Sequence, residues 1–172
     1  WVGKEWFAEP IANEEKIARI CWNTHKWQFP SGTAGKGKKK NAYEFQYGFG
    51  HEEWLLDTTK LIDGYHYAYI QAIATNYEKY LWKTFDISFY SINSDTRQRW
   101  WVGSIKNVHI IDRQESSMVL KEYRREGWYD EMIHQLERVN ANTKAFKKFS
   151  GSFPFAVLKF KPKDLDLLDE PL

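Results

Sequence analysis

Alternation of apolar and polar side chains predicts β-strands through the middle of the chain. Four segments show it: residues 43–47, 65–74, 82–92 and 100–111. In the third segment Phe85, Ile87 and Phe89 fall on one face, as expected for a strand buried on one side. Because short turns separate the four segments, we expect a mostly antiparallel sheet that is curled or closed into a β-barrel.

Apolar side chains at helical spacing predict helices before and after these strands. The opening segment, residues 10–20, reads as an amphipathic helix. Residues 115–139 are helical by pattern with a break near Gly127, and residues 143–149 form a further short helix. A last strand is expected over residues 153–160. The sequence therefore predicts an α+β fold in which helices flank a sheet.

The length of 172 residues is that of a single domain. We assign residues 1–163 to this domain and expect a mobile surface loop at about residues 26–42, because that stretch is rich in glycine and lysine. Residues 164–172 hold four acidic side chains and no basic one, which is typical of an acidic tail, a linker or the start of a short helix. The first residue is not Met, so we expect the domain to be part of a longer protein.

The net charge of +2 conceals an uneven distribution of charge. No acidic residue lies between Glu15 and Glu44, and most of the lysines in that interval fall in residues 26–42, here called the basic loop. Lysines in a glycine-rich loop suit contacts with nucleic-acid phosphates, although a solvated loop without a partner has the same composition. The candidate phosphate-binding residues are Lys26, Lys36, Lys38, Lys39, Lys40, Arg97 and Arg99.

Aromatic residues make up 17% of the chain, and several flank the basic loop. Rings beside basic residues are typical of surfaces on which bases stack, whereas any single ring can equally belong to the core. The candidate base-binding residues are Trp22, Asn23, Thr24, Trp27, Tyr47, Phe49, Trp54, Trp100 and Trp101. Trp100 and Trp101 are consecutive strand residues, so one should point to the core and the other to solvent.

Catalytic and metal-binding motifs are weak by comparison. His51, Glu52 and Glu53 are adjacent, and Leu55 stands where the HExxH zinc motif needs its second histidine. The glycines of the basic loop are not followed by the GK[ST] of a phosphate-binding P-loop. We therefore expect no metal and no cofactor.

Two looser arrangements leave enzymatic alternatives open. Asp112 and Glu115 with Lys121 could serve a metal-dependent nuclease, which needs convergent carboxylates. Cys21 and His25 are four residues apart, but no third group orients them as a nucleophile and its base. Cys21 is the only cysteine, which favours a reducing, cytoplasmic compartment, and no segment has the roughly 18 apolar residues of a membrane span.

The order of elements resembles the PUA-like superfamily, which includes the EVE, YTH and SRA domains. Residues 20–24, Ile-Cys-Trp-Asn-Thr, are similar to the Trp-x-Ser/Thr strand that begins the YTH pocket. Residues 89–91 followed by 101–105, and the closing segment 155–165, resemble the strands of EVE-type domains. The basic loop and the His51–Trp54 segment match no pattern of that superfamily.

This resemblance implies a noncatalytic reader that accepts a modified, flipped base of double-stranded DNA in an aromatic pocket. Trp22 would be a pocket wall, with Asn23 and Thr24 beside it. In prokaryotes such domains are often joined to nuclease or NTPase modules of modification-dependent restriction systems, so a fused or associated module of that kind is the expected partner. The rival hypotheses are a metal-dependent nuclease and a protein-interaction module with an aromatic groove.

Overall fold

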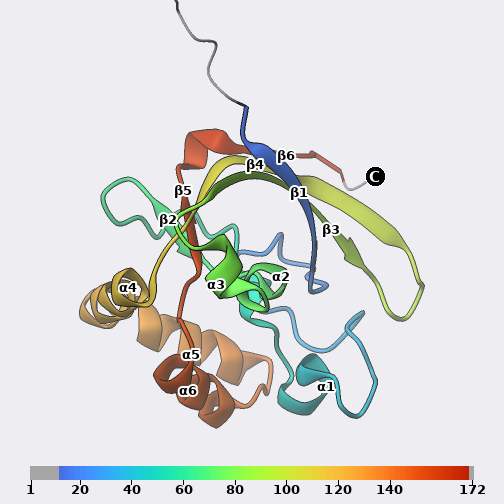
Figure 1. Cartoon of the computed structure of the whole chain (residues 1–172). Helices are drawn as coiled ribbons and strands as arrows, with labels where there is room; N and C mark the ends of the chain where they lie inside the picture. The colour runs from blue at the N-terminus through green and yellow to red at the C-terminus, as the bar shows by residue number, and fades with distance from the viewer. Residues whose placement is uncertain (1–11, 171–172) are drawn as a thin grey trace, which may run out of the picture.

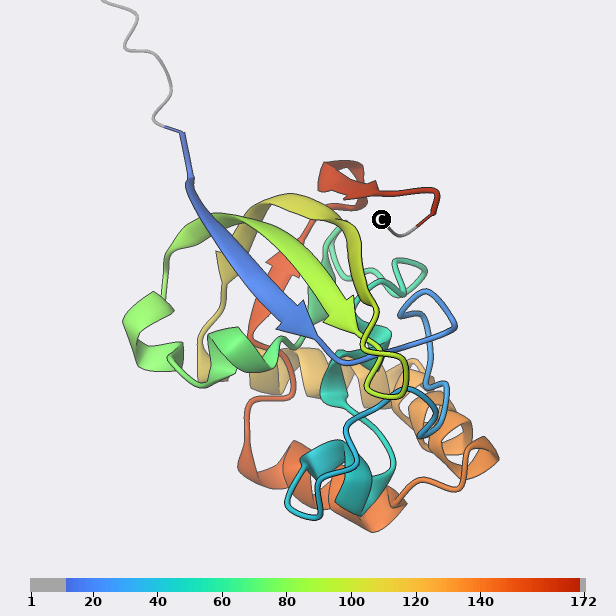
Figure 2. The same cartoon turned by 90° about the vertical axis from the view of Figure 1, so that its right-hand side faces the viewer.

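A computed structural model describes residues 12–170 and contains one six-stranded mixed sheet. The strands are β1 (Glu14–Ile20), β2 (His66–Ala68), β3 (Thr84–Ile92), β4 (Arg99–Ile110), β5 (Leu158–Phe160) and β6 (Leu165–Leu167). Their order is β1-β3-β4-β5-β2, and β6 pairs with β4 beside this path. The first pair, β1 with β3, is parallel, and the other pairs are antiparallel (Figure 2).

The sheet is open. Among residues 12–170 the end strands β1 and β2 do not pair with each other, so the strand path does not return on itself. The expectation of a closed or strongly curled barrel is therefore wrong, while the α+β class and the predominance of antiparallel pairing are confirmed. A barrel needs every edge strand to find a second neighbour, and β2 is only three residues long.

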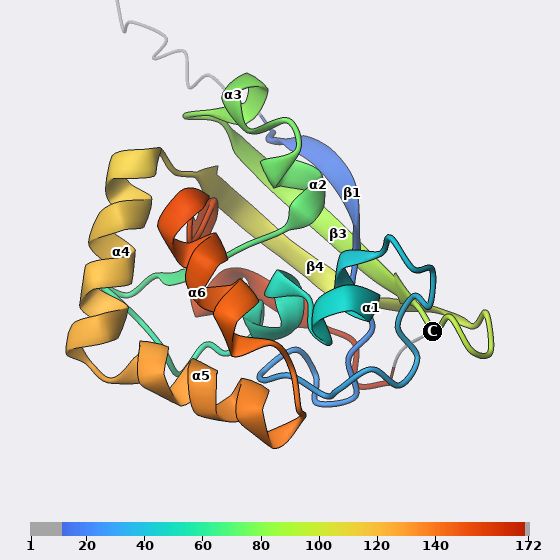
Figure 3. The same ribbon diagram turned by 90° about the horizontal axis from the view of Figure 1, so that it is seen from below.

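The three longest helices lie together on one side of the sheet (Figures 1 and 3). The helices are α1 (Tyr43–Tyr47), α2 (Gln71–Ala74), α3 (Tyr77–Tyr80), α4 (Arg113–Arg125), α5 (Trp128–Arg138) and α6 (Thr143–Ser152), with 3-10 turns η1 (His51–Trp54) and η2 (Pro162–Asp164). The predicted helical stretch and its break are confirmed, because Gly127 adopts a φ of 78° between α4 and α5. Within the described part of the chain, no helix has the length and apolar character to cross a membrane.

The opening segment, for which the sequence predicts a helix, is instead strand β1 in the part that lies within the described residues. Ala18 and Ile20 are buried with a period of two, while Ile17 and Arg19 before and between them are exposed. Glu14 to Ile20 runs beside Phe85 to Ser91 of β3. The partner strand, which local sequence does not reveal, decides the conformation of this segment.

Residues 43–47, for which the sequence predicts a strand, form helix α1. The helix packs Tyr43 against Tyr47 with ring centroids 4.6 Å apart, because residues four apart share a helix face. Gly48 ends the helix with a φ of 81°, in the left-handed conformation common at helix C-termini. The alternation of aromatic and polar residues is thus equally compatible with a short helix.

Other predicted elements are present with different limits. The 65–74 segment contains only the short strand β2 and then turns into α2, and the 153–160 segment contains β5 at its end. Strands β3 and β4 match their predictions within two residues. In the C-terminal tail, expected to be a linker or helix start, Leu165–Leu167 pairs with β4 as strand β6.

Two clusters of buried side chains hold the elements together. The larger lies between the sheet and α2 and α3, and includes Phe85, Ile87 and Phe89 of β3. The smaller lies among α4, α5 and α6 and includes Phe49 and Trp54, which enter it from the segment after α1. The segment from α1 to η1 is therefore fixed by the smaller cluster, and Leu55 and Leu56 directly after it join the larger one.

Candidate functional site

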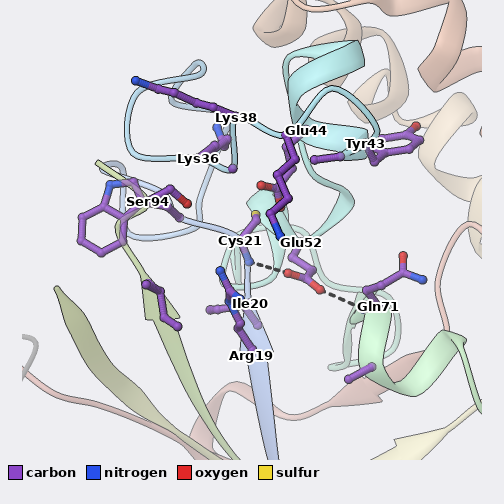
Figure 4. A pocket seen from close by; sticks show the side chains of 16 residues that line it. Arg19, Ile20, Cys21, Lys36, Lys38, Tyr43, Glu44, Glu52, Gln71 and Ser94 are labelled. Atoms are coloured by element: carbon purple, nitrogen blue, oxygen red, sulfur yellow. Dashed lines mark hydrogen bonds between the residues drawn. The ribbon is translucent and has the colours of Figure 1, made fainter. Parts of the chain in front are cut away.

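A cleft of about 910 Å³ opens at the end of the sheet where β1 and β3 both terminate (Figure 4). Parallel strands place their C-terminal ends at the same edge, so Cys21 and Trp22 after β1 lie near Ile92 and Ser94 of the β3 end. The basic loop, α1, η1 and the start of α2 complete the walls. The volume falls in the range of small-molecule sites, roughly 300–1,000 Å³.

The basic loop is held against the turn between β3 and β4. The Gly35 backbone N–H donates to Asp95 Oδ2 at 2.9 Å, and the Ser94 N–H donates to the Gly35 carbonyl at 2.7 Å. Lys38 Nζ lies 2.6 Å from Asp95 Oδ1. Gly35 has a φ of 75°, and a Cβ there would overlap the Trp22 indole ring. Glycine at this position therefore allows the loop to lie directly on the wall of the cleft.

Glu52 is buried in the floor of the cleft. Its Oε2 accepts a hydrogen bond from the Cys21 backbone N–H at 2.6 Å, and its Oε1 accepts one from the Gln71 N–H at 2.8 Å. Burial raises the pKa of Glu52 to about 7, even though both hydrogen bonds favour the charged form. The site therefore contains a carboxyl group that changes charge near neutral pH.

Glu44 on α1 presents a second carboxyl group to the same cleft. Its side chain lies beside the backbone of Gly37 and near Gly50, and it is half-buried. Burial raises the pKa of Glu44 above its usual range, although a hydrogen bond from the Gly37 backbone opposes the shift. Its charge also adds to the rise in the pKa of Glu52, so the two carboxyl groups interact.

Lys36, for which the sequence predicts a phosphate contact, instead forms a buried ion pair. Its Nζ lies 2.7 Å from Glu53 Oε1, and the two side chains are 1% and 0% exposed. Lys36 also donates to the Gly32 carbonyl, while Glu53 accepts further hydrogen bonds from Asn23 and Ser31. With its charge already neutralised inside the protein, Lys36 is a structural residue below the cleft wall.

The other predicted phosphate contacts are exposed but do not all meet. Lys38 and Lys39 line the cleft together with Arg19, which is not among the residues predicted from the sequence. Lys40 follows them on the exposed part of the basic loop. Lys26 precedes the loop's contacts with the sheet, and Arg97 and Arg99 lie in or after the β3–β4 turn, all three exposed and outside the cleft lining.

The predicted base-binding rings divide between core and cleft. Trp27, Phe49 and Trp54 are buried in the two core clusters. Trp22 lines the cleft but is only 4% exposed, and its ring lies 4.2 Å from that of half-buried Trp100. The structure thus removes three of the predicted rings from the cleft, because they are needed to fill the protein interior.

The remaining predicted pocket residues do not line the cleft. Asn23 is buried, and its Oδ1 accepts hydrogen bonds from the backbone N–H groups of His25 and Trp27, so it shapes the turn. Thr24 is exposed, and its N–H donates to Ser31 Oγ. Tyr47 packs against Tyr43 of α1 with the two rings tilted. Trp101 is exposed beside Tyr90, on the opposite face of β4 from Trp100.

A second cavity of about 380 Å³ adjoins the cleft and shares Tyr43, Glu44, Glu52 and Gln71 with it. Its other walls are largely aromatic, and we call it the aromatic chamber; the rings are those of Tyr43, His51, Tyr69, Phe149 and Phe153. Phe153 is 60% exposed at its mouth. The chamber brings together residues from η1, the segment after β2, and α6 that are far apart in the sequence.

His51 is part of the chamber wall and is held neutral. Its ring stacks on Phe149 with centroids 3.5 Å apart, and Nε2 lies 2.7 Å from the Tyr43 hydroxyl. Burial lowers the pKa of His51 to about 3. His51 is therefore uncharged at neutral pH and offers the chamber an aromatic surface rather than a cation.

Sequence reasoning missed most of the residues that line the two cavities. Glu44 could have been noticed as the acid that ends the acid-free interval, and Glu52 as one of three consecutive polar residues after a glycine. Tyr69 and Phe149 carry no such signal, because only the packing of α6 against the segment after β2 brings them together.

The residues of the enzymatic alternatives have structural partners. Asp112 caps α4 by accepting from the Glu115 backbone N–H at 2.7 Å, and Glu115 pairs with Lys159 at 3.1 Å. Lys121 is exposed on α4. Over residues 12–170, no group of three or more His, Cys, Asp and Glu side chains is arranged to hold a metal ion.

Cys21 and His25 also have separate environments. Cys21 is buried beneath the cleft, and burial raises the pKa of its thiol well above the ordinary value. His25 packs against Phe29, and its Nδ1 lies 3.1 Å from the Pro30 carbonyl.

Comparison with protein-family models, with curated proteins and with solved structures finds no match to this chain. The resemblance to the PUA-like superfamily thus remains a hypothesis, and the cleft has to be interpreted from its own chemistry.

Proposed function

We propose that this chain is a noncatalytic nucleic-acid-binding domain that accepts an extruded, modified base of double-stranded DNA in the cleft. The observation that carries the proposal is the layered polarity of the cleft: cations on its rim, aromatic rings at its sides and carboxyl groups in its floor. A nucleotide has the complementary order of groups, with an anionic phosphate outside and a planar, polar-edged base inside.

The rim supplies binding groups for phosphate. Arg19, Lys38 and Lys39 line the opening from two different segments, and all three are exposed. Asp95 pairs with Lys38, but both side chains are solvent-accessible, so a phosphate can replace that partner at small cost. Such contacts would position the DNA backbone without reading its sequence.

The side walls supply surfaces for the base. Half-buried Tyr43 on α1 lines both the cleft and the aromatic chamber and offers a ring for stacking, whereas Trp22 is only 4% exposed and supports the wall. Stacking on a ring contributes about 1–3 kcal/mol per base, which offsets the cost of extruding the base from a duplex. The adjoining chamber leaves space for a substituent on the base.

The superfamily resemblance agrees with this function. Membership of the PUA-like group is part of the same proposal and is supported by the position of the cleft beside Trp22. The open sheet departs from the curled sheet or β-barrel expected of that group. Cleavage of modified DNA would then come from a fused or associated nuclease or NTPase module.

The test is binding of fluorescein-labelled duplexes followed by anisotropy over a range of salt concentrations. The duplexes carry a single cytosine, 5-methylcytosine, 5-hydroxymethylcytosine or N6-methyladenine. We expect tighter binding to one modified duplex. Replacing Arg19, Lys38 and Lys39 together with Gln should weaken binding to all duplexes and lower the salt slope by about 0.9 for each phosphate that is no longer neutralised.

A matched variant controls for overall charge. Lys79, Lys83 and Lys106 are exposed and lie outside the cleft, so changing all three to Gln removes the same charge from another region. This control should keep most of the affinity. Equal weakening in both triple variants would show that the cleft rim is not the site, and no binding to any duplex at low salt would refute the proposed function.

A further inference from the structure

The polar groups that face the interior of the cleft are mainly hydrogen-bond acceptors. Lys36 directs its charge to Glu53 and the Gly32 carbonyl. The Gln71 side chain is engaged on both atoms, because Nε2 donates to Thr75 and Oε1 accepts from the Tyr69 hydroxyl. The carboxyl groups of Glu44 and Glu52 are therefore the strongest hydrogen-bond acceptors that line the interior of the cleft.

Each carboxyl group retains capacity for a ligand. Each Glu52 oxygen accepts one backbone hydrogen bond, and a carboxylate oxygen has two lone-pair sites. The Glu44 carboxyl lies on the border between the cleft and the aromatic chamber, so it can be reached from either cavity. Figure 4 shows Glu44 and Glu52 entering the cleft from different segments of the chain.

We infer that Glu44 and Glu52 select a base that carries an exocyclic amino group, as cytosine and adenine do, and reject a base with a carbonyl oxygen at that position. This inference rests on the proposed function of the cleft. An amino group donates its hydrogens to the carboxyl oxygens, as Glu and Asp accept from the cytosine amino group in DNA grooves. A carbonyl oxygen would instead face other acceptors in the buried floor of the cleft, which is costly.

The charges around the two carboxyl groups make this selection depend on pH. Arg19 of β1 favours the ionised form of both, Lys36 of the basic loop favours the ionised form of Glu44, and Glu53 of η1 opposes it. Four further titratable neighbours are uncharged near neutral pH: Cys21 after β1, Tyr43 from α1, His51 from η1 and Tyr69 after β2. Lys38 and Lys39 of the basic loop line the rim of the same cleft as cations. Glu52, whose pKa is raised to about 7, therefore changes charge near neutral pH, and burial also raises the pKa of Glu44 above its usual range.

Protonation changes what the floor can accept. An ionised carboxylate only accepts hydrogen bonds, whereas a protonated one also donates an O–H and can satisfy a carbonyl oxygen. Preference for an amino base over its oxo counterpart should therefore grow as pH rises and both carboxyl groups ionise.

The decisive probes are two duplexes that differ in the hydrogen-bonding edge of the target base and in the base paired with it, so that neither duplex contains a mismatch. One carries 5-hydroxymethylcytosine and the other 5-hydroxymethyluracil at the same position. We expect the cytosine form to bind roughly five-fold or more tightly at pH 8, with the ratio falling toward one at pH 6. Repeating the comparison with N6-methyladenine and hypoxanthine duplexes extends the test to purines.

The variant Glu44→Gln tests whether the carboxyl group of Glu44 itself, rather than negative charge in general, gives the preference. Gln keeps an acceptor and always carries a donor, so the ratio at pH 8 should drop and vary less with pH. Glu78→Gln is the matched control, since Glu78 is exposed on α3 outside both cavities and the same charge is removed. Melting curves test whether both variants are folded. If Glu44→Gln does not fold, the pH series on the wild-type protein still tests the inference.

The outcomes separate the two proposals. Binding to the duplexes with a ratio near one at every pH overturns the selection by Glu44 and Glu52 and leaves the proposed function standing. Absence of binding to any duplex removes the proposed function and this inference together. A preference for the uracil form also overturns the inference.

Discussion

Lys36 shows how burial decides the role of a charged side chain. In the sequence it belongs to a run of glycines and lysines that resembles a phosphate-binding loop, whereas in the structure it is the most deeply buried lysine of the basic loop. Its partner Glu53 also accepts hydrogen bonds from Asn23, Ser31 and Gly50. The ion pair therefore joins the loop, the turn after β1 and η1 into one unit.

Replacing Lys36 with Met should be strongly destabilising. The change leaves Glu53 charged and buried without its cation, which costs about 3–5 kcal/mol of the free energy of unfolding in comparable sites. Urea denaturation measures this decrease. The double variant Lys36→Met with Glu53→Gln should be less affected than the single one, because no unpaired charge remains.

The neighbouring lysine gives the control. Lys38 pairs with Asp95 in an exposed position, so Lys38→Met should change the free energy of unfolding by less than about 1 kcal/mol. If Lys36→Met were as mild as Lys38→Met, the buried ion pair would not have the structural role assigned to it.

At the level of single residues the sequence predicts part of the candidate site. It points to Trp22, Lys38 and Lys39, because a local excess of basic residues beside an aromatic residue is visible in the sequence itself. It places Trp27, Phe49 and Trp54 in the pocket although they are core, since composition does not distinguish an exposed ring from a buried one. Although Glu44 and Glu52 stand out in the sequence, it does not reveal their roles, because the raised pKa of each carboxyl group arises from burial.

Among the elements, the basic loop depends on its contact with the β3–β4 turn. Gly35 makes that contact through both its N–H and its carbonyl, and its φ of 75° suits glycine. Because the loop forms a wall of the cleft, its attachment and the function of the cleft are linked.

Gly35→Ala should detach the loop and weaken binding of DNA. The new methyl group would overlap the Trp22 ring in addition to straining the backbone, so we expect stability to fall by well over about 1 kcal/mol. Gly64→Ala is the control, because Gly64 has a similar φ of 82° with no atom within 4 Å of the added Cβ. Thermal denaturation and the anisotropy assay compare the two, and equal effects would mean that backbone strain alone matters.

Secondary structure is predictable where an element carries its own pattern. β3 alternates perfectly between buried and half-buried side chains, and α4 and α5 are separated by a glycine that the sequence displays. β1 is not predictable in this way, because its conformation depends on β3, far along the chain. α1 is not either, because five residues are too few to distinguish a helical period from a strand period.

For the molecule as a whole, buried ionisable groups predict a particular dependence of stability on pH. The pKa of Glu52 rises from 4.5 to about 7 on folding, so the folded state holds a proton that the unfolded state has released. The contribution of Glu52 to the free energy of unfolding is fully present below pH 4.5 and is lost as pH rises through 7. His51 acts in the opposite direction, since its pKa falls from 6.5 to about 3 and stability is lost as pH falls below 6.5.

Glu52→Gln isolates the first of these effects. As pH rises from 4.5 to 7, the unfolding free energy of the wild type should fall relative to that of the variant by about 1.4 kcal/mol per pH unit. Denaturant unfolding at several pH values measures it, and the subtraction cancels His51 and the other groups. A difference that does not vary with pH would mean that Glu52 ionises normally in the folded protein.

The overall class could be predicted from the sequence, but the open form of the sheet could not. Alternation and helical spacing identify strands and helices, which together define an α+β fold. Whether the end strands meet depends on the lengths and the pairing of β1 and β2, and no local pattern records either.

The parallel pairing of β1 with β3 has a consequence for how the protein is made. Glu14 has to find Phe85, and Ile20 has to find Ser91, so β1 emerges from the ribosome long before its neighbour in the sheet exists. The intervening chain must close a large loop before this pairing forms, and such distant contacts are slow to form. The cleft, bounded by the last residues of both strands, should therefore be among the last parts of the molecule to assemble.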